Sequence, residues 1–368
     1  MFLKNAWYVA AWGDEVAPGK LFERTIIGES LVMYRKSDGA PVIMDNTCPH
    51  RFAPLSQGKL FGDKIECPYH GLHFGPDGHC ALNPYGDGKI PARARVNSYP
   101  VVERHAILWV WMGDPALANP DEIPDFSCHV NPASPTVKGV IEMHANYELV
   151  TDNLMDLTHV TYVHEGVLGS EAVKRGEHEV LQAGTTVYSN RWCPDGDAPP
   201  AWDMMFGNYG KPVDHWLYMR WDAPAHMLLD VGIVPTGRPR EEGIWMYGTD
   251  ILTPKDENST HYFWACSRSY RLDDPAAGEE WVRAIDIAFV NQDKPMIESQ
   301  ARMMKNRTFD DMDPVLLPVD AAAVRCRRLL AELVATNTPP QPTVTLLSEL
   351  IKDEREKSTA AKRLVPVV

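Results

Sequence analysis

The chain has 368 residues, of which 44% are hydrophobic and 23% charged, and its 36 basic and 50 acidic residues give a net charge of -14. This length suffices for two domains of ordinary size, and the hydrophobic content excludes a disordered chain. The acidic balance argues against a nucleic acid as partner, and the lack of any run of about 18 apolar residues argues against a membrane span. Seven cysteines are an odd number, so we expect a reducing, cytoplasmic location and no disulfide framework.

The first part of the chain, residues 1–113, consists of short runs of β-forming residues separated by turns. The runs 31–35 and 42–45 flank Asp38-Gly39, which is a strong hairpin signal. We expect a second hairpin over residues 101–111. These patterns predict an all-β N-terminal domain.

Two loops of this domain carry cysteine and histidine in alternating order, at Cys48, His50, Cys67 and His70. The common zinc finger has its two cysteines first and its two histidines last. A Rieske [2Fe-2S] centre needs a pair of cysteines on one iron and a pair of histidines on the other. The order therefore favours a Rieske cluster, with a zinc clip between the two loops as the alternative.

Residues 114–135 hold five prolines with little periodicity, which predicts a linker. A second domain over residues 136–338 combines long strands with two helices, which predicts an α+β arrangement of helices on an antiparallel sheet. The expected elements are strands over 137–148, 216–221, 227–234, 244–252 and 261–268, and helices over about 275–306 and 320–336. We expect the proline-containing tail, residues 339–368, to be a peripheral extension.

A second group of chemically active residues lies between strands of this domain. Asp152, Asp156 and His159 are spaced at i, i+4 and i+7, so they would share one face of a helix. His164 follows His159 by five residues, about 140° out of line on an ideal helix. Both histidines can reach one point only if the helix ends or carries a π-bulge. An acidic helix face exposed to solvent is the alternative.

A mononuclear non-haem iron needs two histidines and one carboxylate on one side of the metal. In the late helix, Asp293 shares an apolar stripe with Phe289 and Ile297, and a buried carboxylate requires a cation nearby. Asp293 is therefore our candidate for the third ligand. Asp286 and Glu298 remain the alternatives.

These segments resemble the Rieske non-haem iron oxygenases, and among them the oxygenase components of the vanillate O-demethylase, dicamba demethylase and toluenesulfonate methyl-monooxygenase group. The resemblance covers most of the chain. It rests on Asn5 to Ala10, Cys48 to Ser56, Cys67 to Leu72, Asp152 to His159, Tyr162 to His164, and Gln292 to Lys294. It implies an N-terminal Rieske domain and a helix-grip-like catalytic domain.

The resemblance also implies the ligands of both metals. Cys48, His50, Cys67 and His70 would bind the [2Fe-2S] cluster, while His159, His164 and Asp293 would bind mononuclear Fe(II). Asp156 matches the family's bridging carboxylate, which in homotrimers links an iron-ligand histidine to a cluster histidine of the neighbouring subunit. Asn153 matches a residue near the iron.

The implied function is monooxygenation of a small aromatic substrate by a homotrimer. Without a G-x-G-x-x-G turn we expect no dinucleotide site, so electrons would come from a separate NAD(P)H-dependent reductase. Our first expectation is O-demethylation of a vanillate-like methoxy acid. The alternative is ring or side-chain hydroxylation of a sulfonated, chlorinated or methylated aromatic. A third hypothesis, from a different class of function, is an electron-transfer or metal-storage protein that keeps only the cluster.

The family's substrate pocket does not carry over to this chain. The dicamba enzyme holds its substrate with a histidine late in the sheet, where the similar stretch here contains Asp250. Pockets of this kind place few polar groups. Asp250 is therefore a candidate substrate contact, with an ordinary strand residue as the alternative.

Overall fold

The computed structural model describes residues 1–305, 307–342 and 365–366. The chain divides into two compact units, of which unit 1 comprises Met1–Asp121 and Thr253–Glu257 and unit 2 comprises Glu122–Leu252 and Asn258–Val368. Among the described residues, no helix is long and apolar enough to cross a membrane. Most of the tail 339–368 lies outside the described residues.

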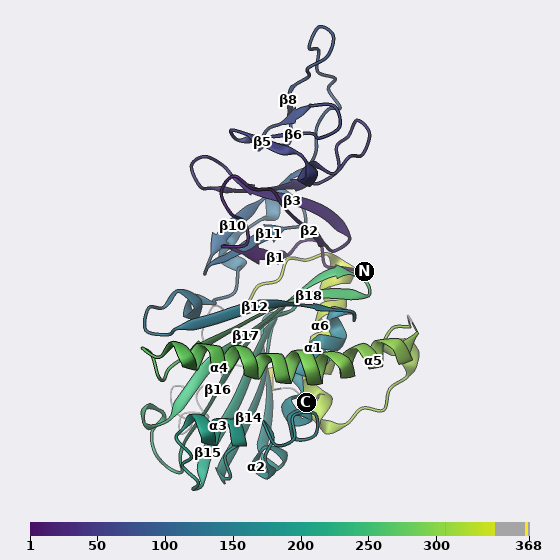
Figure 1. Ribbon diagram of the computed structural model, residues 1–368. Helices are drawn as coiled ribbons and strands as arrows, with labels where there is room; N and C mark the ends of the chain where they lie inside the picture. The colour runs from purple at the N-terminus through teal and green to yellow at the C-terminus, as the bar shows by residue number, and fades with distance from the viewer. Residues whose placement is uncertain (306, 343–364, 367–368) are drawn as a thin grey trace. The chain divides into compact units, whose positions relative to one another are not determined.

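Unit 1 is all-β, as the sequence predicts, and contains three antiparallel sheets (Figure 1). The sheet orders are β1-β11-β10, β2-β3-β4-β9 and β5-β6-β7-β8. The strands are β1 Trp7–Trp12, β2 Phe22–Ile26, β3 Glu29–Arg35, β4 Pro41–Asp45, β5 Lys59–Phe61, β6 Lys64–Glu66, β7 His73–Phe74, β8 Cys80–Leu82, β9 Ser98–Tyr99, β10 Val101–Arg104 and β11 Ile107–Trp111.

Both predicted hairpins of unit 1 are present. β3 and β4 pair antiparallel across a turn in which Gly39 has φ +87°. β10 and β11 are joined by His105 and Ala106, whose φ values are +58° and +61°. Two successive positive φ values match the twist of a tight two-residue hairpin.

Unit 2 is built on one antiparallel sheet of eight strands in the order β12-β18-β17-β16-β15-β14-β13-β19. The predicted α+β class is confirmed. The strands are β12 Thr136–Met143, β13 Glu177–Ala183, β14 Thr186–Gly196, β15 Val213–Asp222, β16 His226–Pro235, β17 Ile244–Asp256, β18 Ser259–Arg268 and β19 Val365–Pro366. The helices are α1 Tyr147–Met155, α2 Glu171–Arg175, α3 Pro200–Met205, α4 Pro275–Ile285, α5 Lys294–Met304 and α6 Ala321–Thr336.

The predicted helix over 275–306 is one long rod made of three parts, and Figure 1 shows it lying across the large sheet. A π-helical segment, Asp286–Asp293, lies between α4 and α5. The Asp274 side chain accepts a hydrogen bond from Ala276 N and caps the start of α4. The expected helix over 320–336 is α6, although the Asp320 side chain binds Leu317 N and does not cap the helix.

Two predicted strand boundaries are wrong. The strand expected over 137–148 ends at Met143, because Asn146 accepts a hydrogen bond from Glu148 N and starts α1 at Tyr147. The strand expected over 244–252 is longer than predicted. β17 continues to Asp256, which leaves only residues 257 and 258 between β17 and β18.

Candidate metal centres

Helix α1 ends at Met155, directly before the residues expected to form the iron site. The Asp156 carboxylate accepts hydrogen bonds from Thr158 N at 2.9 Å and Thr158 Oγ1 at 2.6 Å. Such local side-chain bonds compete with continuation of a helix, and a 3₁₀ turn, Leu157–Thr161, follows. The expectation that Asp152, Asp156 and His159 share one helix face is therefore wrong.

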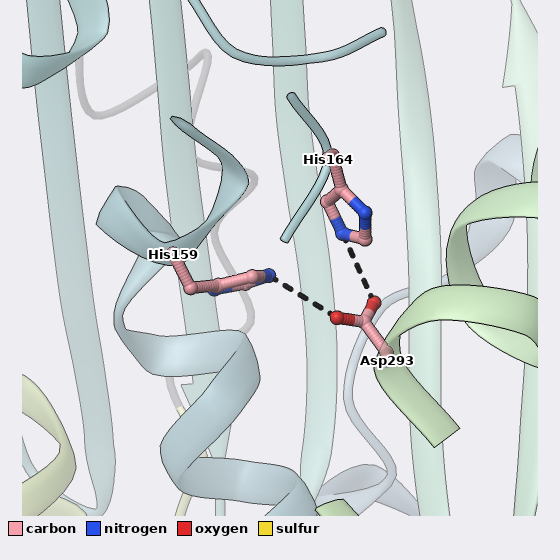
Figure 2. A group of neighbouring side chains, drawn as sticks. All are labelled: His159, His164 and Asp293. Carbon is pink, nitrogen blue, oxygen red and sulfur yellow. Dashed lines mark ion pairs between the residues drawn. The ribbon is translucent and has the colours of Figure 1, made fainter. Parts of the chain in front are cut away.

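The end of α1 lets His159 and His164 approach one carboxylate from the late helix (Figure 2). His159 Nε2 lies 3.5 Å from Asp293 Oδ1, and His164 Nε2 lies 3.2 Å from Asp293 Oδ2. The ligating atoms of the three residues all lie within 4.8 Å of one another. This is the donor set of a two-histidine, one-carboxylate iron site.

Hydrogen bonds fix the orientation of both imidazole rings. His159 Nδ1 donates to the main-chain oxygen of Asp156 at 2.7 Å, and His164 Nδ1 donates to Gln292 Oε1 at 2.7 Å. Each ring therefore presents the lone pair of Nε2 toward Asp293, as a metal ligand must. Burial lowers the pKa of His159, which favours the neutral, metal-binding form.

Asp293 is the last residue of the π-helical segment and is only 5% exposed. Asn153 Nδ2, from α1, lies 3.3 Å from Asp293 Oδ1 and orients the carboxylate. A buried carboxylate that faces the Nε2 atoms of two imidazoles fits a divalent cation, because a buried carboxylate without a counter-charge is costly.

The two rival carboxylates lie elsewhere. Asp286, at the start of the π-helical segment, is exposed to solvent. Glu298 accepts a hydrogen bond from His144 N at 2.9 Å and lies 3.6 Å from Lys294 Nζ. Neither belongs to the group that gathers around His159 and His164.

The four ligands of the predicted cluster lie in two loops of unit 1 and form two pairs. The Cys48 and Cys67 side chains belong to a hydrophobic core, and burial raises the pKa of the Cys48 thiol to about 11. The rings of His50 and His70 have centroids 4.5 Å apart. Main-chain bonds from Phe52 N to Cys48 O and from Gly71 N to Cys67 O close the two turns.

This pairing distinguishes a cluster from a zinc clip. Ligands around one tetrahedral zinc lie about 3.3–3.8 Å from one another. Within the described part of the chain, the His159 group alone brings three such ligand atoms within 4.8 Å. One pair of sulfur ligands, Cys48 and Cys67, and a separate pair of imidazoles, His50 and His70, suit a cluster of two irons. Binding to iron would keep the buried thiols deprotonated in spite of their raised pKa.

The remaining candidates have other contacts, and sequence reasoning missed several partners. Asp152, expected on one helix face with Asp156 and His159, binds Arg327 of α6 through both oxygens, at 2.6–3.1 Å. The 3%-exposed Asp250 accepts a hydrogen bond from Tyr262 Oη at 2.6 Å. At the candidate iron site, the missed partner is Gln292, which accepts the hydrogen bond from His164 Nδ1. Its position directly before Asp293 was the available signal.

Known protein families match both units. Residues 6–100 match the Rieske [2Fe-2S] domain, and residues 143–336 match the vanillate O-demethylase oxygenase C-terminal domain. This pair of domains, with the candidate metal sites described above, defines the class of Rieske non-haem iron monooxygenases. The chain belongs to this family, in the group of dicamba, vanillate and toluenesulfonate oxygenase components. It carries a Rieske [2Fe-2S] cluster and mononuclear iron.

Individual relatives cover nearly the whole chain. The chloroacetanilide N-alkylformylase oxygenase component of Rhizorhabdus wittichii is 42% identical over 348 residues, covering 92% of this chain and 98% of the relative. The dicamba O-demethylase oxygenase component of Stenotrophomonas maltophilia is 41% identical over 335 residues, covering 90% and 98%. The crystal structure of dicamba monooxygenase bound to 3,6-dichlorosalicylic acid is 41% identical, with a TM-score of 0.87 and coverage of 91% and 98%.

Proposed function

We propose that this chain is the oxygenase component of a multi-component system that demethylates a small methoxy-aromatic compound. The methoxy group, dioxygen, two electrons and two protons give a hemiacetal and water, and the hemiacetal releases formaldehyde and leaves a phenol. The observation that carries this proposal is the convergence of His159 Nε2, His164 Nε2 and the Asp293 carboxylate. Relatives named for dicamba and vanillate O-demethylation support the reaction type.

In this proposal His159, His164 and Asp293 hold ferrous iron, while Cys48, His50, Cys67 and His70 hold the cluster. When bound, the cluster would supply electrons one at a time, and the ferrous iron would supply the chemistry of dioxygen activation. Asn153 keeps the Asp293 carboxylate turned toward the two imidazoles. The main-chain oxygen of Asp156 and the side chain of Gln292 accept hydrogen bonds from the Nδ1 atoms of the two histidines. These bonds leave Nε2 of each ring as the nitrogen that can bind a metal.

Asp156 has the further role of linking two subunits of a homotrimer. Its Oδ1 is occupied by Thr158, while its Oδ2 has no hydrogen-bond partner among residues that the structure describes. That oxygen is available to a cluster histidine of a neighbouring subunit, and His50 is exposed to solvent. A carboxylate between two such histidines offers a path for electrons and protons.

Electrons reach the cluster from a separate NAD(P)H-dependent reductase in the cytoplasm. The relatives are named as oxygenase components, which implies further components. All seven cysteines are free and buried, which suits a reducing compartment.

A second candidate is hydroxylation without loss of formaldehyde. The relative that favours it is the toluene-4-sulfonate monooxygenase iron-sulfur subunit of Comamonas testosteroni, 37% identical over 344 residues. Its name describes a substrate without a methoxy group.

A substrate screen with a surrogate reductase tests the proposal. Methoxy-aromatics and their methyl, chloro and sulfonate analogues are compared for oxygen uptake, formaldehyde and hydroxylated product. We expect formaldehyde equal to the oxygen consumed with at least one methoxy-aromatic. Coupled hydroxylation of the analogues without formaldehyde from any methoxy compound would favour the second candidate.

A further inference from the structure

Asp250 points to the face of the large sheet that carries helix α1. Residues paired across antiparallel strands share a face, and the register places Asp250 in one row with Trp221, with β16 between them. Two residues before Trp221, Met219 is paired with Ser189, whose Oγ donates to Met155 O at the end of α1. Side chains two residues apart on a strand share a face, so Asp250 and α1 lie on the same side.

Asp250 is also connected to the segment that carries the third iron ligand. Its Oδ1 accepts a hydrogen bond from Tyr262 Oη at 2.6 Å. The Tyr262 ring stacks on the Phe289 ring, with centroids 5.6 Å apart. Phe289 lies in the π-helical segment that ends with Asp293. Asp250 is therefore part of the wall beside the iron site.

The surroundings of Asp250 offer no positive charge. Burial raises the pKa of Asp250 to about 7, the Tyr262 hydrogen bond lowers it, and Asp293 raises it; no basic side chain of the described residues contributes. Its Oδ2 has no hydrogen-bond partner in the described part of the chain. Trp221 Nε1, in the same row, is a buried donor that also has no partner there.

The buried Trp221 Nε1 is costly to leave without a partner, and a substrate can supply partners both to it and to Asp250 Oδ2. Resting on the function proposed above, we propose that Asp250 determines substrate specificity by accepting a hydrogen bond from an N–H or O–H group of an uncharged aromatic substrate. Trp221 Nε1 is available to an acceptor such as a carbonyl on the same substrate. Aromatic carboxylates are rejected, so the substrate is not a vanillate-like acid.

The rejection follows from like charges in a buried site. A substrate carboxylate beside the ionised form of Asp250, which predominates above about pH 7, would place two negative charges together without any cation. Like-charge contacts of this kind cost several kcal/mol. Iron bound by Asp293 offsets the charge of that carboxylate but leaves the Asp250 carboxyl without a positively charged partner. An amide of the same shape carries no charge and supplies an N–H donor.

Three probes of similar shape separate charge from hydrogen bonding: 4-methoxybenzamide, methyl 4-methoxybenzoate and 4-methoxybenzoate. Binding to the full-length holoenzyme is measured by anaerobic equilibrium dialysis, so that turnover is not required. We expect the amide to bind at least about tenfold more tightly than the carboxylate, with the ester between them. Equal or tighter binding of the carboxylate, or no binding of the amide, would overturn the proposal. An ester that binds as tightly as the amide would show that no hydrogen bond from the substrate to Asp250 contributes to binding, and would also overturn the proposal.

The variant Asp250→Asn keeps the shape but replaces one oxygen with a donor. We expect its preference for the amide over the carboxylate to fall at least about tenfold. Asp214→Asn is the matched control, because Asp214 is a buried acid on the opposite face of the same sheet, bonded to Asp195 N and Gly237 N. An unchanged preference in Asp250→Asn refutes the proposal. If that variant does not fold, the three-probe comparison on the wild type decides the question alone.

The failure of this inference is distinguishable from failure of the proposed function. Formaldehyde released from any methoxy-aromatic supports demethylation, whatever the charge of the compound. The order of the three dissociation constants tests Asp250 alone.

Discussion

At the residue scale, the iron site depends on acceptors that hold each imidazole by its other nitrogen. A main-chain oxygen, that of Asp156, holds His159, whereas a side chain, Gln292, holds His164. A main-chain acceptor survives any substitution of its own side chain, but a side-chain acceptor does not. The two histidines should therefore respond differently when their partners are changed.

The first prediction concerns Gln292→Leu. The change removes the acceptor of His164 Nδ1, so the ring is no longer fixed, and we expect iron affinity to fall about 10–100-fold. Competition with an iron chelator measures this, with the visible spectrum of the cluster as an internal standard. Gln182→Leu is a control, because the Gln182 side chain, in the hairpin of β13 and β14, binds Gly184 O and Arg325 and, among the described residues, no histidine. Equal iron affinity in both variants would refute the positioning role.

At the scale of elements, the candidate iron ligands are brought together by two departures from a regular α-helix, the 3₁₀ turn after α1 and the π-helical segment before α5. The sequence predicted that the helix near His159 must end or carry a π-bulge. It ends, because Asp156 bonds to Thr158, and the π-helix occurs instead in the segment that carries Asp293. Spacing alone could not place either break, since each depends on a local hydrogen bond or on packing against the sheet.

The predicted strands of the N-terminal unit were more accurate because turn residues such as Asp38-Gly39 determine local conformation directly. The strands β13 and β14 were missed. The resemblance named the ligands, but long-range partners such as Arg327 for Asp152 and Tyr262 for Asp250 carry no signal in a single sequence. Their contacts join residues far apart in the chain, so only the fold reveals them.

The second prediction concerns the contact between α1 and α6. Arg327 binds Asp152 and Glu148, and burial raises the pKa of Asp152 to about 6 against the effect of Arg327. Arg327→Met leaves a buried carboxylate without its cation, which should reduce the free energy of unfolding by about 3 kcal/mol near neutral pH. Urea unfolding measures the loss. Arg283→Met is the control, because its pair with Glu279 is exposed and should contribute little.

The same variant should show a defined pH dependence. A carboxyl whose pKa is higher in the folded protein destabilises it as pH rises from the unfolded value of about 4 through the folded value. Without Arg327, the folded pKa of Asp152 rises further. The deficit of Arg327→Met should therefore be small near pH 5 and largest above about pH 7. A deficit that is the same at both pH values would show that lost packing, and not charge, causes it.

The third prediction concerns the loops of the cluster. Cys48→Ala removes one ligand, so the red-brown colour should disappear, and iron should fall from about three to about one per chain. Cys128→Ala is the control, because Cys128 is a buried cysteine of unit 2. Visible absorbance and iron content are the measurements. A colourless, zinc-containing wild type prepared under iron-replete, anaerobic conditions would contradict the cluster.

At the scale of the whole molecule, Asp156 has a bridging role only in the proposed homotrimer, where its side chain would bind a cluster histidine of the neighbouring subunit. The fourth prediction is that Asp156→Asn keeps its iron, because the main-chain oxygen still holds His159. Turnover should fall by about 100-fold or more, since the link between the two metals is weakened. The defect should be seen as a reduced cluster that is not reoxidised when substrate and oxygen are added. Loss of iron with normal activity per remaining site would instead make Asp156 a structural residue.

The central claim is that one chain holds both a two-iron cluster and a third iron at His159, His164 and Asp293. Iron counted per chain in the wild type and in Asp293→Ala tests it most directly. We expect about three irons in the wild type and about two in Asp293→Ala, with an unchanged spectrum of the reduced cluster. Glu298→Gln, the matched acidic control, should keep about three. A third iron that persists in Asp293→Ala, or that is lost in Glu298→Gln, would contradict the account.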